Sequence, residues 1–123
     1  DRLNVFIKDK SFGTKYTEEL LKFIYEAFDG LDKIVYKDKK YTLNKQLFKL
    51  YWCLDGISKF TDYIDIETLY NILERCIKID EYTVREKAAY IINKKKDNKT
   101  FKKLYDEINK DSNYYVKRIS EKD

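Results

Sequence analysis

One stretch, residues 43–60, constrains the fold more than any other part of the chain. Its aliphatic residues recur at spacings of four, three, four and three, which places them on one stripe of an α-helix: Leu43, Leu47, Leu50, Leu54 and Ile57. Further apolar residues stand off this stripe: Phe48, Tyr51, Trp52 and Cys53. A helix that is apolar nearly all round is covered by other helices on several sides. We therefore expect residues 43–60 to form the central core helix.

Gly56 and the two cysteines add detail to the expected core. Gly56 lies inside the stretch and costs a helix about 1 kcal/mol relative to alanine, so we expect a close crossing with a neighbouring helix there. Cys53 and Cys76 each lie on an apolar helical stripe. Both are predicted to be reduced core residues, as is typical of a cytosolic protein.

The composition favours helices joined by short connections. The chain has 123 residues, no proline and three glycines, and 43% of its residues are hydrophobic. No apolar run approaches the roughly 18 residues of a membrane span, and no signal peptide is visible. At this length we expect a single domain over residues 1–123. Because the chain starts at Asp1 and contains no methionine, we interpret it as an N-terminal domain excised from a longer protein.

Before the central helix, the pattern predicts two or three shorter elements. A short apolar segment comes first, and a turn is expected over residues 11–14. Thr17 is predicted to cap a helix that ends at Asp29 and Gly30. A short helix is expected over residues 31–35, followed by a basic connection over residues 37–42. The first apolar segment consists of Leu3, Phe6 and Ile7.

After the central helix, four more helices are predicted. Asp65 is the expected cap of a helix that extends to Ile77, after a loop at residues 61–63. Thr83 and Glu86 have the spacing of a capping box, and the residues expected to face inward behind them are Val84, Ala88, Ile91 and Ile92. A loop at residues 97–98 precedes helices over residues 101–108 and 115–119. The total is about seven or eight helices without a strand, which favours an all-α right-handed superhelix.

The residue types exclude several kinds of chemistry. The chain has no histidine, which excludes cysteine–histidine and serine–histidine nucleophiles, and two distant cysteines are too few for the usual zinc sites. No glycine-rich phosphate loop is present. We therefore expect no enzymatic activity, no cofactor and no metal. The net charge is +4. Because most of the basic residues are lysines rather than arginines, we expect weak contact with anionic surfaces but no sequence-specific recognition of nucleic acid.

Two groups of lysines are candidates for binding an anion. The first surrounds the start of the central helix and consists of Lys37, Lys39, Lys40, Lys45 and Lys49. With the helix N-terminus these lysines can converge on a phosphate, or they can merely extend over apolar surface beside a loop. The second group is interpreted as a solvated surface near a helix end: Lys94, Lys95, Lys96, Lys99, Lys102 and Lys103.

Two segments resemble the epsin N-terminal homology (ENTH) domain and the wider group that includes the VHS domains. Residues 47–60 resemble that family's leucine-rich helix, with its aromatic-lysine start, leucine-aspartate pair and lysine near the end. Residues 84–88, valine-arginine-glutamate-lysine-alanine, are similar to the start of a later helix, and Thr83 stands where the family has an asparagine cap. The helix that ends at Asp29 lies in a similar register.

The resemblance implies a non-enzymatic adaptor domain in vesicle-mediated membrane trafficking, with a right-handed superhelix of about eight helices. The expected partners are an adaptor complex, clathrin or SNARE proteins. The domain would be a monomer in the cytoplasm, peripherally associated with vesicle, Golgi or endosomal membranes. Lys49 and Lys45 stand at or near the basic positions of the family's phosphoinositide pocket. Gln46 replaces a histidine of that pocket, and nothing before Asp1 supplies the lipid-inserting helix, so we expect weak phosphoinositide binding at most.

Two alternatives remain open at this point. The first is a nuclear domain that binds the tail peptide of RNA polymerase II, which has the same superhelical architecture. It would need a groove of basic residues and tyrosines, for which Tyr63, Tyr70 and Arg75 are the candidates. The second is a helical-repeat scaffold that binds neither a lipid nor a peptide.

Overall fold

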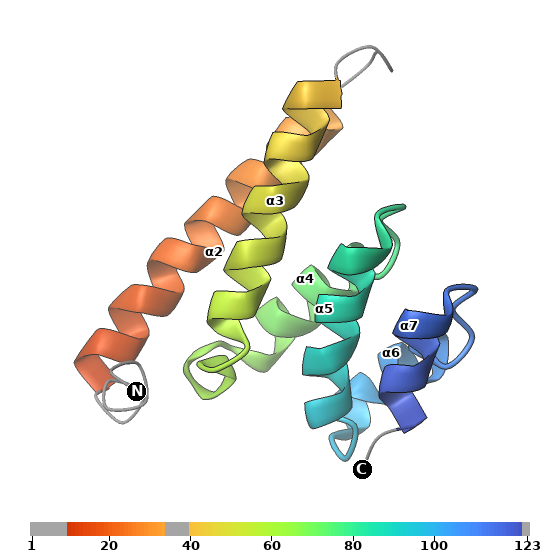
Figure 1. Ribbon diagram of the computed structural model, residues 1–123. Helices are drawn as coiled ribbons and strands as arrows, with labels where there is room; N and C mark the ends of the chain where they lie inside the picture. The colour runs from red at the N-terminus through yellow and green to blue at the C-terminus, as the bar shows by residue number, and fades with distance from the viewer. Residues whose placement is uncertain (1–9, 34–39, 122–123) are drawn as a thin grey trace. The chain divides into compact units, whose positions relative to one another are not determined.

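The structure, a computed structural model, describes residues 10–33 and 40–121, and all regular elements in these ranges are helices (Figure 1). They are α2 (Lys10–Asp32), α3 (Lys40–Ile57), η1 (Thr61–Tyr63), α4 (Ile66–Cys76), α5 (Tyr82–Lys94), η2 (Lys99–Phe101), α6 (Lys102–Ile108), α7 (Tyr114–Lys117) and η3 (Arg118–Glu121), where η marks a 3-10 helix. The expected all-α class is confirmed. The superhelix of seven or eight helices stays a prediction.

The contacts between residues divide the chain into two compact units. Unit 1 covers residues 1–65 and contains α2, α3 and η1. Unit 2 covers residues 66–123 and contains the remaining helices. Buried apolar residues lie in the helices of both units, and the expected single domain over residues 1–123 stays a prediction.

In unit 1, α2 and α3 run side by side in opposite directions (Figure 1). The three glycines of unit 1 each lie at a close contact of α2. A Cβ on Gly56 would lie 2.8 Å from Leu20 Cδ1, and a Cβ on Gly13 would lie 2.6 Å from the Tyr63 ring. A Cβ on Gly30 would lie 2.7 Å from the Gln46 side chain. The expected close crossing at Gly56 is therefore confirmed, and Gly30 serves the same α2–α3 contact, whereas Gly13 lets α2 approach η1.

Only one side of α3 is buried. Leu50, Leu54 and Ile57 have no exposed surface, which confirms the apolar stripe. Phe48 and Trp52, in contrast, are 65% and 61% exposed. The expectation that other helices cover this helix on several sides was wrong for these two residues. At about 100° per residue, both lie on the side of α3 opposite Leu50, away from the face that packs in the interior.

The beginning and end of α2 also differ from expectation. Residues 11–14 are helical rather than a turn, and Thr17 lies inside α2 rather than capping it. Its hydroxyl donates hydrogen bonds to the carbonyl oxygens of Gly13 (2.9 Å) and Thr14 (3.0 Å). Gly30 does not end the helix, which extends to Asp32. The expected segment at Leu3, Phe6 and Ile7 lies outside the described residues, as do residues 34–39. Residues 31–32 belong to α2 and residues 40–42 to α3, so the separate short helix expected from residue 31 and the connection expected up to residue 42 were wrong in these described parts.

In unit 2, the central helix is α5. It contacts α4, α6, α7 and η3, and its buried residues are Val84, Ala88, Ala89, Ile91 and Ile92. The small side chains of the two alanines let the neighbouring helices approach. The inward face predicted for this helix is confirmed, as are the apolar stripes of α4 and α6. The helix that other helices surround is thus α5, within unit 2, whereas we had expected residues 43–60.

The cap of α5 is one residue before the helix, not at Thr83. Glu81 is the N-cap, and its carboxylate accepts hydrogen bonds from the Thr83 amide (3.4 Å) and the Thr83 hydroxyl (3.0 Å). The predicted capping box of Thr83 and Glu86 was therefore wrong, because the helix already includes Tyr82. The loop predicted at residues 97–98 is confirmed, and Asn98 caps η2 through its side-chain oxygen.

Both cysteines are buried and free, as expected. Burial raises the pKa of the Cys76 thiol strongly and that of the Cys53 thiol less. Because the thiolate is the reactive form, a raised pKa leaves less of it at any given pH. We expect a thiol-specific reagent to modify neither cysteine in the folded chain and both in denaturant, as measured by mass spectrometry. Rapid modification of Cys76 without denaturant would contradict its burial.

Candidate docking surface on helix α3

The lysines predicted to bind a phosphate are only partly described. Lys37 and Lys39 lie outside the described residues. Lys40 is the first residue of α3, but its side chain is outside the described part. Lys45 and Lys49 lie one helical turn apart on α3, where Lys45 is exposed and Lys49 half-buried. The predicted phosphate site at this helix start therefore stays a prediction.

Lys49 is held in a contact with α2. Its Nζ donates a hydrogen bond to Glu26 Oε2 at 2.9 Å and lies 5.2 Å from the centre of the Phe23 ring. The hydrogen bond from Lys49 lowers the pKa of the Glu26 carboxyl. The ion pair is therefore present when the pH is above the ordinary pKa of a glutamate carboxyl. It is lost as the pH falls through the lowered pKa of Glu26. A phosphate at Lys49 would have to replace Glu26.

This arrangement leads to a prediction about membrane affinity. Glu26→Gln should release Lys49 and raise binding to vesicles containing phosphatidylinositol bisphosphate by about twofold to fivefold at low salt. Glu19→Gln is the matched control, because it changes the charge of α2 equally at an exposed position. Sedimentation with vesicles measures the binding of both variants. Equal binding by the two variants would show that Glu26 does not restrain a lipid-binding lysine.

The outer face of α3 carries two large aromatic side chains. Phe48 and Trp52 are one turn apart on the helix, and Lys45 lies one turn from Phe48. The Trp52 ring meets the half-buried Tyr51 ring edge-on, with 5.3 Å between their centres. We call Lys45, Phe48 and Trp52 the α3 outer face. The sequence did not lead us to predict the α3 outer face, although Phe48 and Trp52 lie outside the apolar stripe that contains Leu50 and Leu54.

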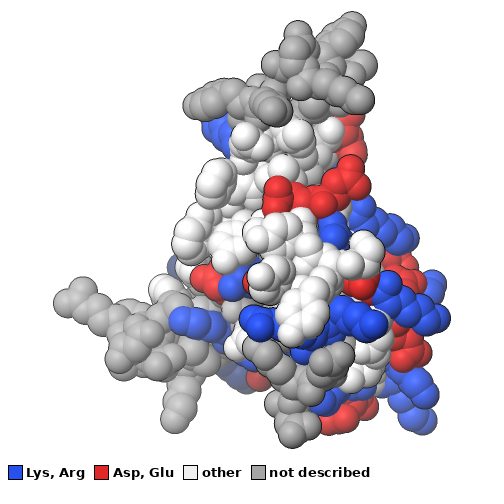
Figure 2. Space-filling view, turned by 45° about the vertical axis from the view of Figure 1, so that its right-hand side comes forward, with Lys and Arg blue, Asp and Glu red and all other residues white. Residues whose placement is uncertain are grey.

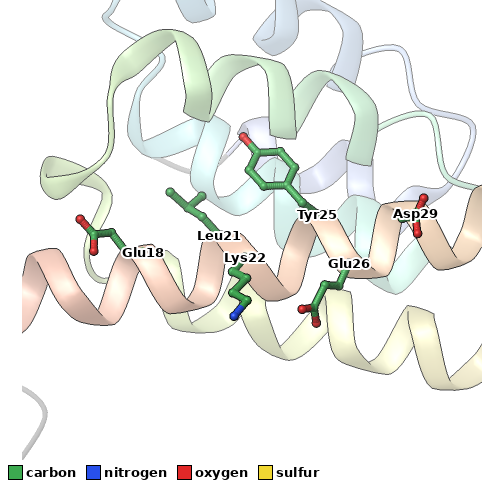
Figure 3. A pocket seen from close by; sticks show the side chains of 6 residues that line it. All are labelled: Glu18, Leu21, Lys22, Tyr25, Glu26 and Asp29. Atoms are coloured by element: carbon green, nitrogen blue, oxygen red, sulfur yellow. The ribbon is translucent and has the colours of Figure 1, made fainter.

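A shallow depression on α2 does not form a comparable site. It is lined by Glu18, Leu21, Lys22, Tyr25, Glu26 and Asp29. All six side chains come from one helix, and Figure 3 shows Leu21 and Tyr25 pointing to one side of it and Lys22 and Glu26 to the other. Functional groups that diverge in this way do not converge on a ligand.

The tyrosines proposed for a peptide groove take part in packing instead. The Tyr63 ring lies against the backbone of Gly13 in unit 1. The Tyr70 ring lies 6.0 Å from the Phe101 ring in unit 2, and Arg75 is exposed in the last turn of α4. Tyr63 belongs to unit 1, whereas Tyr70 and Arg75 belong to unit 2, and the groove of these three residues stays a prediction.

Charged side chains of both signs are interspersed over the face drawn in Figure 2. In the second lysine group, Lys103 Nζ lies 4.0 Å from Glu74, and Lys99 and Lys102 are exposed. Among the described residues, no three acidic or cysteine side chains are placed to hold a metal ion. In the same ranges, no helix is both long and apolar enough to cross a membrane.

Comparisons of the chain with protein-family models, with the curated proteins and with the solved structures found no match. The ENTH/VHS resemblance of residues 47–60 and 84–88 therefore stays a prediction from those motifs alone.

Proposed function

We propose that this chain is a non-enzymatic docking module that serves as an adaptor in vesicle-mediated membrane trafficking. The proposal includes a right-handed superhelix of seven or eight helices, of the ENTH/VHS type. The observation that carries it is the exposure of Phe48 and Trp52 on α3, because this is the helix on which the resemblance mainly rests.

Two exposed rings on one helix face are a favourable surface for a partner. A buried aromatic side chain removes about 150–250 Å² from water, and tryptophan is among the residues that contribute most to binding at interfaces. Phe48 and Trp52 are 65% and 61% exposed, so most of this area is available for a partner to cover. Apolar area that the fold itself leaves exposed thus supports a docking function.

The charge beside these rings indicates the chemistry of the partner. Lys45 is exposed and forms no ion pair with a described carboxylate. A segment with an apolar side chain for the two rings and a carboxylate for Lys45 would complement the α3 outer face. The resemblance suggests that the segment belongs to an adaptor-complex subunit, clathrin or a SNARE protein. We favour this function over a polymerase-tail reader because the Tyr63 and Tyr70 rings already pack within their own units.

Membrane contact plays a secondary part in this proposal. The lysine group at the start of α3 would give weak, salt-sensitive affinity for phosphoinositides, since Lys49 is paired with Glu26. The protein would then act in the cytoplasm, on the surface of vesicle, Golgi or endosomal membranes, and its protein partners would contribute most of the affinity.

Proximity labelling of the full-length protein in its native cell tests the proposal. The wild type should recover clathrin, adaptor subunits or SNARE proteins, and the double variant Phe48→Ala/Trp52→Ala should lose them. Tyr25→Ala is the control, because it removes a ring that is 52% exposed on α2 instead. Recovery of polymerase and RNA-processing factors would overturn the trafficking role. Unchanged recovery in the double variant would overturn the α3 outer face as the docking surface.

A further inference from the structure

Unit 2 contains a groove of about 400 Å³ along α5 and η3. Its lining residues are Glu86, Lys87, Tyr90, Asn93, Lys94, Arg118 and Ile119. Three of these side chains are cationic and one is anionic, so the groove has an excess of positive charge. Lys94 and Arg118 form no ion pair with a described carboxylate. Sequence analysis missed the groove, because its residues come from segments more than twenty positions apart.

Aromatic and positively charged groups lie together in this groove. Tyr90 is 45% exposed. Lys94 Nζ lies 4.4 Å from the centre of its ring, and Lys87 Nζ lies 6.0 Å from it. These are cation–π distances, at which the ring and the two charges form one surface.

More tyrosines continue this surface beyond the groove. Arg118 Cζ lies 5.4 Å from the centre of the Tyr115 ring, which in turn lies 6.1 Å from Tyr82 and 5.7 Å from Tyr114. Tyr82, Tyr114 and Tyr115 are 40%, 69% and 50% exposed. Tyr82 and Tyr90 are about 12 Å apart along the axis of α5. The groove and these three tyrosines together form an extended row of exposed rings and cations. We call this whole surface the tyrosine groove.

We propose that the tyrosine groove binds single-stranded nucleic acid without sequence preference. Proteins of this kind combine a positive groove for the phosphates with aromatic rings on which bases stack. Here Lys87, Lys94 and Arg118 contact the phosphates, and the exposed rings of Tyr90 and Tyr115 receive bases. An acidic peptide would use the three cations equally well, but it would give the row of exposed tyrosines no partner. This function is independent of the adaptor role proposed for α3.

Fluorescence anisotropy of labelled oligouridine and oligothymidine with the full chain tests this binding. If three phosphates are neutralised, affinity should fall about 20-fold between 50 and 200 mM salt. Unlabelled polyglutamate provides the comparison with an acidic polypeptide. It should compete far less well than the oligonucleotides, because it has no bases to stack. Equal competition by polyglutamate would overturn the proposal.

Single substitutions separate stacking from charge. Tyr90→Ala should lower the affinity for oligouridine about tenfold, whereas Tyr90→Phe should leave it unchanged. Lys94→Glu should abolish measurable binding, while Lys99→Glu makes the same charge change at an exposed position outside the groove. Glu86→Gln should strengthen binding, because it removes the carboxylate from the groove lining.

Circular dichroism of each variant establishes that it is folded. If Tyr90→Ala unfolds, Tyr115→Ala replaces it, since Tyr115 is the other ring proposed to receive a base and is 50% exposed. A folded alanine variant with wild-type affinity would overturn the stacking role. Equal losses in Lys94→Glu and Lys99→Glu would show that only the overall charge attracts the oligonucleotide, which would overturn the groove as the site.

Discussion

Asp111→Ala should cost about 3–5 kcal/mol of unfolding free energy, because it leaves the Arg85 guanidinium buried without its counter-charge. Arg85 Nε donates a hydrogen bond to Asp111 Oδ2 at 2.9 Å, and Nη2 donates to Oδ1 at 3.3 Å. The two side chains are only 14% and 11% exposed. Arg85 Nη1 also donates to the carbonyl oxygens of Ile79 (2.8 Å) and Asp80 (2.6 Å).

The pair therefore joins three segments of unit 2. Arg85 on α5 binds the loop that follows α4, and Asp111 belongs to the loop between α6 and α7. Asp111 Oδ1 also accepts a hydrogen bond from the Asn113 amide at 2.8 Å, just before α7. Losing the Asp111 carboxylate would thus remove its hydrogen bonds with both Arg85 and the Asn113 amide, which hold the loop between α6 and α7.

Urea denaturation followed by circular dichroism measures this effect. Lys103→Ala is the control, because its contact with Glu74 is long (4.0 Å) and its side chain is 67% exposed, so it should cost about 0.5 kcal/mol or less. The double variant Arg85→Ala/Asp111→Ala should lose less than the sum of the two single variants. A cost for Asp111→Ala no greater than that of Lys103→Ala would show that the pair does not stabilise the fold.

Leu54→Ala should cost about 2–5 kcal/mol, as a large-to-small change at a position with no exposed surface. Leu50→Ala should cost a similar amount for the same reason. Phe48→Ala removes a larger side chain from the same helix, but Phe48 is 65% exposed, so its cost should be about 0.5 kcal/mol or less.

The comparison of these α3 variants tests which side of the helix faces the interior. Urea denaturation gives all three free energies under one condition. If Phe48→Ala destabilised the chain as much as Leu54→Ala, α3 would be covered on both sides and the α3 outer face would not exist.

The two proposed surfaces differ in chemistry and therefore in their response to salt. The α3 outer face presents two apolar rings and one exposed lysine, so binding there should depend mainly on buried area. The tyrosine groove has three cations, and binding there should weaken steeply with salt. Measuring the affinity of each surface for its ligand at several salt concentrations therefore distinguishes an adaptor partner from a nucleic acid.

Much of the helical structure could be predicted because it follows from local spacing. The stripes of α4, α5 and α6 were predicted from apolar residues three and four positions apart. Helix ends were harder. Residues 11–14 have the composition of a turn, yet they are helical, and the Tyr63 ring packs against Gly13 there. A contact between positions so far apart in the chain leaves no local pattern.

The sequence by itself determined that the regular elements of the described residues are helices, that Leu50 and Leu54 are buried, and that both cysteines are free. These properties depend on neighbouring residues along one helix. Only the tertiary structure decided that Phe48 and Trp52 are exposed, that Lys49 meets Glu26, and that Arg85 meets Asp111. The physical reason is that a helix has several faces, and spacing shows which residues share a face but not what covers it. The candidate surfaces lie on the uncovered faces, so sequence analysis could not find them.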